Sequence, residues 1–452
     1  MSSPASKANE TGPSLRRVLG LRDLVLFGLV IIQPVAPLPV FGVLSNRGHG
    51  HVVTAILLAM VAMVATAISY GRMARAYPSA GSAFTYVGQE IHPLLGYITG
   101  WSMVMDYLLN PIICIVWCSK AAINFLPAVP FWIWVIVFFA AFTGLNLRGV
   151  KTSARINATL VAGMTVVIVI FFVQAFRYIF GHPHPGAAFF TQPFYDPATF
   201  RLKDVLGGTS IAVLTYIGFD GISTLSEEVD NPRRNILLAT VLTCVLIGVL
   251  SAAEAYAAQL VWPASQPFHD VDTAFVEIAR RCAGPWFFVV VNLTLLVASF
   301  GSGMGAQLGA ARLLYGMGRS NALPRSFFGK VDARSRVPRN NVLFTGVLAL
   351  VGAYLLSYQL GAEMLNFGAL IAFMGVNAAA FLRYYVRAEK KQATNFIPPT
   401  LGFLVCLLLW LNLSRPAKIA GSIWMASGVA YGAWRTKGVF LGDLISFEVP
   451  ET

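Results

Sequence analysis

Three carboxylates stand inside strongly apolar segments of this chain: Asp106, Asp220 and Glu254. An ionised carboxylate at the centre of a bilayer costs about 3 kcal/mol or more on insertion scales, so each such side chain needs a partner or a role. A carboxylate at that depth can pair with an ammonium group or accept a proton. These residues therefore indicate the binding of a cation.

Asp220 is the strongest candidate of the three for binding a cation, because a predicted break in a helix lies directly before it. Residues 215–224 hold Gly218, Gly221 and three hydroxyls. Backbone that is not helical survives at membrane depth only where it lines a cavity or is buried in protein. The carboxylate of Asp220 either faces such a cavity or caps free N–H groups where the helix resumes, and these two roles are compatible.

A second break is predicted between residues 28 and 42. Pro34, Pro37 and Pro39 fall within six residues, and each lacks an N–H and clashes with the preceding turn. Transporters usually hold an α-carboxylate with free backbone N–H groups at the ends of half-helices, and here three such donors are missing. We therefore expect an organic cation as the substrate, one that lacks a carboxylate.

The composition places these breaks in a membrane protein. Of the 452 residues, 56% are apolar and only 12% are charged, whereas soluble proteins carry about 25% charged residues. A soluble enzyme is therefore excluded. All six histidines fall in predicted loops or near helix ends, which disfavours a membrane enzyme as well. Apolar windows of about 19 residues predict twelve transmembrane helices, near residues 24–43, 52–70, 94–119, 130–147, 156–180, 207–228, 234–262, 284–317, 340–358, 362–387, 396–414 and 417–434.

The two breaks lie roughly 180 residues apart, and each opens a set of about five helices. This spacing is typical of transporters built from inverted repeats, whose substrate site lies between the broken helices. The sequence thus predicts an all-α membrane protein that works by transport. The first apolar run lacks a small-residue cleavage site, so it is expected to stay in the protein as the first span.

The charges predict how the chain is oriented. With the N-terminus in the cytoplasm, 24 of the 33 Lys and Arg residues fall on the cytoplasmic side, as the positive-inside rule requires. Both termini are therefore expected to be cytoplasmic. The same distribution explains the net charge of +13 without nucleic acid as a partner. No cofactor or metal is expected, because the five cysteines are scattered and His182 and His184 have no third ligand near them in sequence.

Several motifs resemble those of the amino acid-polyamine-organocation permeases. Among the subfamilies, the chain is most similar to bacterial putrescine importers, through Pro34, the pair Asp106-Tyr107 and the run 225–228. The resemblance covers nearly the whole chain. Its motifs are residues 216–228 with Asn231-Pro232, residues 78–86, residues 311–319 and residues 366–373.

This resemblance implies a fold like that of the leucine transporter. Helices 1 to 5 and 6 to 10 would form a 5+5 inverted-repeat core, followed by two peripheral helices. The chain would then divide into a cytoplasmic tail (1–20), the transport core (21–388), and helices 11 and 12 with a C-terminal tail (389–452). The substrate-binding residues that the resemblance implies are Gln33, Pro34, Val35, Ala36, Pro37, Tyr107, Leu214, Thr215, Tyr216, Ile217 and Asp220.

Two departures from the family pattern bear on substrate and coupling. Putrescine importers carry a further acid in helix 1, near the position of Pro39, and this chain has none there, so a monoamine or a neutral substrate stays open. Some proton-coupled relatives place a lysine in helix 5 where this chain has Met164. The coupling ion is expected to be a proton, with sodium as the alternative. The candidate coupling residues are Asp106, Asp220, Ser299 and Ser302.

The sequence therefore predicts an ion-coupled secondary transporter that imports a small, putrescine-like organic amine across the inner membrane of the cell by alternating access. The alternative is an amino acid permease or exchanger for α-amino acids. The expected partners are the amine or amino acid substrate, the coupling ion and the lipid bilayer.

Overall fold

The computed structural model describes residues 19–77, 82–148, 154–184, 186, 188–225, 229–319, 323–332 and 337–435. Within these ranges the protein is helical, and its only strand-like feature is an isolated bridge between Leu19 and Val229. The two predicted tails lie largely outside the described residues. The α-helices are α1 (Leu21–Ile32), α2 (Phe41–Arg47), α3 (Val52–Ala76), α4 (Ser82–Glu90), α5 (Pro93–Ile123), α6 (Phe131–Leu147), α7 (Ala154–Gly181), α8 (Ala188–Thr191), α9 (Leu202–Ala212), α10 (Pro232–Val261), α11 (Ala274–Ala283), α12 (Pro285–Arg319), α13 (Arg325–Phe328), α14 (Arg339–Leu355), α15 (Tyr358–Phe381), α16 (Ala393–Leu411) and α17 (Arg415–Arg435).

Eight helical segments of the described chain are long and apolar enough to cross a membrane. Each of the twelve ranges expected from the sequence overlaps helical structure, although residues 33–40 within the first range are not helical. Some of these helices are short, because prolines and turns divide them: α1 has 12 residues and α14 has 17. The boundary between α14 and α15 also differs from the expected one, since Ser357 caps α15 by accepting a hydrogen bond from the Leu360 N–H at 3.2 Å.

The first predicted break is present between α1 and α2. Helix α1 ends at Ile32, and the capping residue Gln33 has φ 71° and ψ 138°. The following residues form successive turns, in which the N–H of Ala36 bonds the carbonyl of Gln33 and the N–H of Leu38 bonds that of Val35. The three prolines cannot donate such bonds, so the chain stays non-helical until α2 begins at Phe41.

The second predicted break is present after α9. The helix tightens into a 3-10 turn, η1 (Val213–Tyr216), and resumes as a second 3-10 segment, η2 (Phe219–Leu225). Gly218 lies between them with φ +118°, a conformation that side-chain-bearing residues rarely adopt. A Cβ at this position would lie 2.6 Å from Cγ2 of Ile31. Glycine is therefore required both by the backbone angle and by the close approach of α1.

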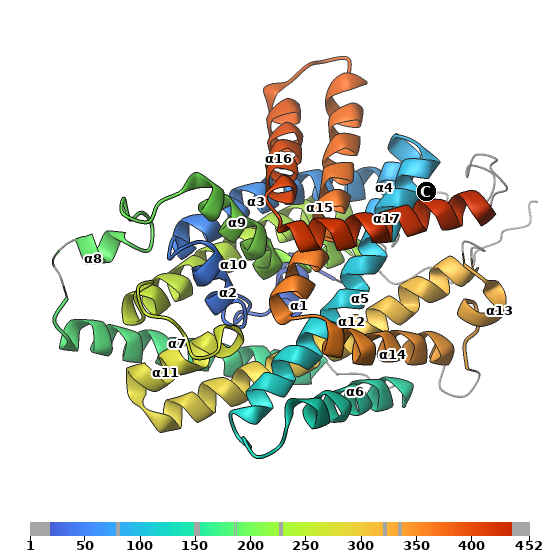
Figure 1. Cartoon of the computed structure of the whole chain (residues 1–452). Coiled ribbons are helices and arrows are strands. Elements are labelled where there is room, and N and C mark those ends of the chain that lie inside the picture. The colour runs from blue at the N-terminus through green and yellow to red at the C-terminus, as the bar shows by residue number, and fades with distance from the viewer. Residues whose placement is uncertain are drawn as a thin grey trace, which may run out of the picture.

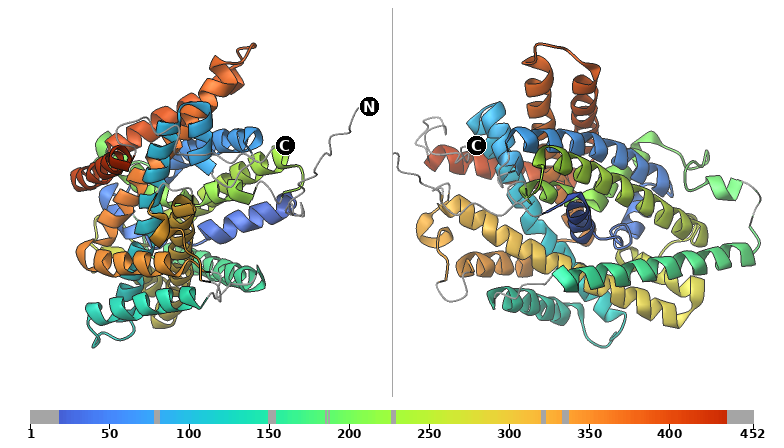
Figure 2. Two further views of the ribbon diagram at one scale, coloured as in Figure 1. Left: turned by 90° about the vertical axis from the view of Figure 1, so that its right-hand side faces the viewer. Right: turned by 180° about the vertical axis from the view of Figure 1, so that it is seen from behind.

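Long helices pack around these two breaks (Figure 1). Helix α10 packs extensively against α3 and also contacts α1, while α5 packs against α12 and α15. Helix α16 and the neighbouring part of α15 project from the body as a hairpin, and α17 crosses α5 (Figure 2). Short helices that the sequence prediction did not include, α4 and α11, lie between the long ones in the chain.

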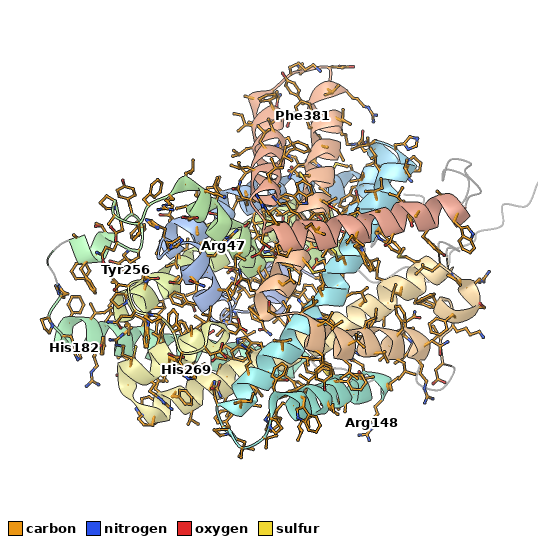
Figure 3. The ribbon with its side chains drawn as sticks, in the orientation of Figure 1. Arg47, Arg148, His182, Tyr256, His269 and Phe381 are labelled. Atoms are coloured by element: carbon orange, nitrogen blue, oxygen red, sulfur yellow. The ribbon has the colours of Figure 1, made fainter. Side chains whose placement is uncertain are left out.

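The molecule has two distinct ends, which the long helices connect (Figure 3). Arg148, which caps α6, lies at one end, and His182 and His269 lie at the other. At the second end, segment η3 (Val271–Thr273) and α11 connect α10 to α12.

Candidate functional site

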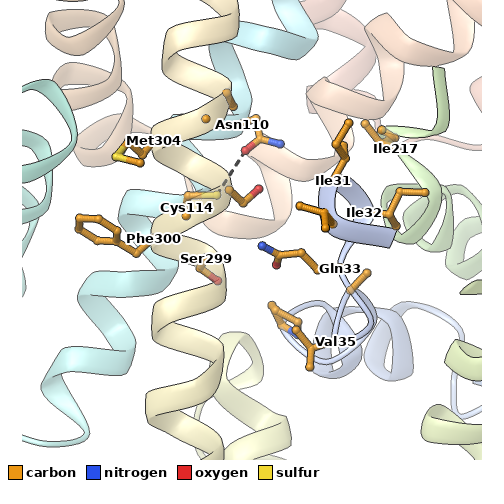
Figure 4. Close-up of a pocket in the computed structure, with 18 of the residues that line it drawn as sticks. Ile31, Ile32, Gln33, Val35, Asn110, Cys114, Ile217, Ser299, Phe300 and Met304 are labelled. Carbon is orange, nitrogen blue, oxygen red and sulfur yellow. Dashed lines mark hydrogen bonds between the residues drawn. The ribbon is translucent and has the colours of Figure 1, made fainter. Parts of the chain in front are cut away.

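A cavity of about 660 Å³ lies between the two helix breaks. Its walls come from α1 and the turns after it, from α5, from α7, from η1 and η2, and from α12. Figure 4 shows Gln33 pointing across this space toward the part of α12 that carries Ser299. The sequence prediction that the breaks flank a cavity is therefore confirmed.

Most of the residues predicted for the site line this cavity. They are Gln33, Val35, Ala36, Asp106, Tyr107, Leu214, Ile217, Asp220, Ser299 and Ser302.

Four predicted residues do not line it: Pro34, Pro37, Thr215 and Tyr216. Tyr216 is fully buried and donates a hydrogen bond from its hydroxyl to the backbone carbonyl of Ile56 on α3, at 2.9 Å. Thr215, the preceding residue, is also fully buried. The structure thus gives Tyr216 a role in holding the break against α3.

Sequence reasoning missed a face of α5. Asn110, Ile113, Cys114 and Trp117 line the cavity together with Asp106. Asp106, Asn110 and Cys114 are four residues apart, so they lie on one side of the helix, and the thiol of Cys114 lies 3.3 Å from the side-chain oxygen of Asn110 (Figure 4). This spacing, with two polar residues in an apolar helix, was the signal available in the sequence. Phe300 and Tyr358 also line the cavity. The sequence around each of them indicates only packing, so neither could be predicted for the site.

Gln33 connects the first break to α12. Its side-chain amide donates to the carbonyl of Ala298 at 3.1 Å, across the cavity wall. Ser299 follows directly, and Ser302 lies almost one turn further along α12. The cavity therefore places amide and hydroxyl groups opposite the unwound part of helix 1.

The carboxylate of Asp220 combines the two roles that the sequence left open. The residue is only 8% exposed and lines the cavity. Its carboxylate accepts hydrogen bonds from backbone N–H groups around the break, at Gly218, Asp220 and Gly221. Asp220 thus caps the start of η2, and it remains the negative group that the second broken helix presents to the cavity.

Asp106 and its neighbour Tyr107 both line the cavity. Neighbouring residues of a helix point about 100° apart, so the two side chains reach the cavity in different directions. Gly309 of α12 leaves room for the Tyr107 ring, since a Cβ there would lie 3.1 Å from the ring.

Trp117 lines the cavity where α5 contacts η3. The ammonium of Lys120 lies 3.1 Å from the carboxylate of Asp270 and 2.6 Å from that of Asp272. The indole N–H of Trp117 donates to the backbone carbonyl of Asp272 at 2.8 Å. Burial raises the pKa of the Asp272 carboxyl, although Lys120 acts in the opposite direction. The ion pairs therefore contribute only modestly to holding η3 against α5.

Phe27, in the middle of α1, also lines the cavity, and so does Arg312, near the end of α12. Arg312 is exposed, and it is the single basic residue among the described residues that line the cavity. The polar groups in the interior are thus acidic or neutral, an arrangement that suits a cation.

Comparison with known proteins gives a consistent result. The amino acid permease family matches residues 40–444. The low-affinity putrescine importer PlaP of Escherichia coli (strain K12) is 35% identical over 434 residues, which covers 95% of this chain and 96% of that protein. The branched-chain amino acid permease BcaP of Lactococcus lactis is 28% identical, covering 93% of this chain and 96% of that one. The methylthioribose transporter of Bacillus subtilis is 24% identical, covering 93% and 94%.

The match begins at residue 40, after α1 and the first break, and it extends over the second break and over the cavity walls from α5, α7 and α12. The description of this family agrees with a helical membrane protein that crosses the bilayer many times. It also agrees with transport rather than catalysis as the activity. This chain is a secondary transporter and belongs to the amino acid permease family.

Proposed function

We propose that this protein imports a small, putrescine-like organic amine, driven by an ion gradient, through alternating access around the cavity between the broken helices. The observation that carries the proposal is the pair of carboxylates, Asp106 and Asp220, on the walls of a cavity whose only basic residue in the described chain is the exposed Arg312. Buried charges in proteins are paired, and a cationic substrate would pair these.

The architecture that we propose has twelve transmembrane helices. Helices 1 to 5 and 6 to 10 form two inverted repeats like those of the leucine transporter, each opening with one of the breaks at Gln33 and Gly218. Two peripheral helices, α16 and α17, follow. In this division the core is 21–388, flanked by the tail 1–20 and the segment 389–452, with both termini in the cytoplasm and the protein in the inner membrane of the cell.

In this orientation, we propose a state that is open toward the cytoplasm. Phe27 and Arg312 then lie on the cytoplasmic side, while Lys120, Asp270 and Asp272 close the extracellular side. A substrate that has entered from outside would leave the cavity past the first half of α1. A proton is the coupling ion that we propose, and sodium near Ser299 and Ser302 is the alternative.

The second candidate function is transport of α-amino acids. It is favoured by the relative BcaP, a branched-chain amino acid permease that matches 93% of this chain. An amino acid substrate needs donors for its carboxylate, and the turns after α1 contain three prolines that lack an N–H. This chemistry makes the amine the stronger candidate.

A thermal-shift screen of the purified protein separates these functions, because a ligand that binds the folded state raises its apparent stability. The screen compares putrescine, cadaverine and spermidine with γ-aminobutyrate, lysine, arginine and leucine. We expect the amines without a carboxylate to raise the Tm and the amino acids to leave it unchanged. If only carboxylate-bearing compounds raise the Tm, the protein is an amino acid permease.

A further inference from the structure

Two acids on different elements of the fold line the cavity. Asp106 is on α5, in the wall that faces the unwound part of helix 1, and it lines the cavity together with Asp220 of η2. Tyr107, next to Asp106 on α5, lines the same cavity. The cavity thus holds two negative groups on two different helices.

Neither carboxylate has a cationic partner in the described chain. The ion pairs among those residues join Asp204, Asp270, Asp272 and Glu90 to basic side chains, and none involves Asp106 or Asp220. Asp220 accepts hydrogen bonds from backbone N–H groups, but such bonds carry no full positive charge. Two unpaired carboxylates within one low-dielectric cavity repel each other and lose hydration. They are complementary to a ligand with two positive charges.

We propose that Asp106 binds the second ammonium group of a diamine whose first ammonium group is held at Asp220, an assignment that rests on the proposed function. Other residues that line the cavity suit the middle of such a ligand. Ile31, Ile217 and Phe300 line the cavity with apolar side chains that can cover a methylene chain (Figure 4). The amide of Asn110, one turn from Asp106, adds a neutral acceptor beside the second ammonium group.

The assignment separates the roles of the two acids by ligand charge. A diamine contacts both carboxylates, whereas a monoamine of the same length needs only one. Loss of Asp106 should therefore weaken the binding of diamines selectively, while loss of Asp220 should weaken the binding of diamines and monoamines alike. A purely structural role for Asp106 would not produce this selectivity, and neither would a role confined to ion coupling.

The test is isothermal titration calorimetry of the purified full-length protein with putrescine and with 1-aminobutane, which has the same four carbons and one amine. The variants are Asp106→Asn, Asp220→Asn and the control Glu389→Gln, an exposed acid outside the cavity. We expect Asp106→Asn to lower the affinity for putrescine at least about tenfold, the loss typical of a charge-assisted contact. Its effect on 1-aminobutane should be less than about threefold, which also shows that the variant is folded. The control should bind both as the wild type does.

Three results would overturn the assignment. If Asp106→Asn binds putrescine as tightly as the wild type, the second subsite is elsewhere, although the proposed function stands. If it weakens both amines equally, Asp106 acts on the cavity as a whole rather than on the second ammonium group. If the wild type itself binds neither amine and binds leucine, both the assignment and the proposed function fail.

Discussion

Two fully buried glutamates of this protein have opposite surroundings. Glu254, on α10, is 0% exposed, and neither carboxylate oxygen has a hydrogen-bond partner in the described chain. Glu90, at the end of α4, is 2% exposed and accepts from the Tyr77 hydroxyl at 2.8 Å and from Arg383 at 2.9 Å, and it also pairs with Arg387. An ionised carboxylate is compatible with the second environment and not with the first.

Replacement by glutamine should therefore affect these two positions differently. Glu254→Gln keeps the shape of a neutral carboxyl group and should leave the Tm of the purified protein unchanged or raise it. Glu90→Gln removes the charge between two arginines, and should lower stability by about 1–2 kcal/mol. The estimate is modest because the arginine side chains are 39% and 57% exposed. Thermal unfolding followed by tryptophan fluorescence measures both variants.

The two variants serve as controls for each other, since each exchanges one buried glutamate for glutamine. A fall in Tm for Glu254→Gln as large as that for Glu90→Gln would show that Glu254 is ionised and has a partner. In that case, the carboxyl of Glu254 would be part of an ion pair in solution.

At the scale of the elements, the second helix break depends on a single glycine. Gly218 has φ +118°, and a Cβ there would meet Ile31 at 2.6 Å and Ile32 at 3.3 Å. The break positions Asp220 and brings η2 against the end of α1. A side chain at this position would strain the backbone and push the two broken helices apart.

Gly218→Ala should therefore destabilise the protein by about 1–3 kcal/mol and weaken ligand binding. The matched control is Gly163→Ala on α7, where a Cβ would meet nothing within 4 Å and alanine favours the helix. The control should keep its Tm and its affinity for amines. Equal Tm values for the two variants would contradict the requirement for glycine at the break.

Much of the element scale was accessible from the sequence. Three prolines within six residues and the pattern around Gly218 were sufficient to predict both breaks, because their effect on the backbone is local. The neighbourhood of Asp106 was not accessible in the same way. Which side of α5 faces the cavity depends on how α1, α7 and α12 pack around it, and no local pattern specifies that. For the same reason, the sequence did not reveal that Thr215 and Tyr216, which were expected at the site, are buried away from the cavity.

At the scale of the whole molecule, the residues that line the cavity range from Trp117 on α5, beside η3, to Arg312 on α12. The contacts of Lys120 and Trp117 with η3 connect α5 to the segment before α11. Alternating access requires that these contacts break when the other end closes. The side chain of Lys120 is 29% exposed, so its ion pairs are weaker than fully buried ones.

Lys120→Met should shift the protein toward the state in which this end is open. A loss of about 1 kcal/mol from the closed state corresponds to roughly a fivefold change in the ratio of the two states. Hydrogen exchange measured by mass spectrometry should then be faster in residues 264–283 than in the wild type, and unchanged in α16. Unchanged exchange in residues 264–283 would mean that the ion pairs do not hold the closed state.

The central claim is that this permease carries a cationic amine, and uptake into proteoliposomes tests it most directly. The purified protein is reconstituted, an inward proton gradient is imposed, and the accumulation of radiolabelled putrescine and leucine is followed, with Asp220→Asn as the binding-deficient comparison. The account predicts that putrescine accumulates above its external concentration, that leucine does not, and that Asp220→Asn accumulates neither. Accumulation of leucine that putrescine does not inhibit would contradict it.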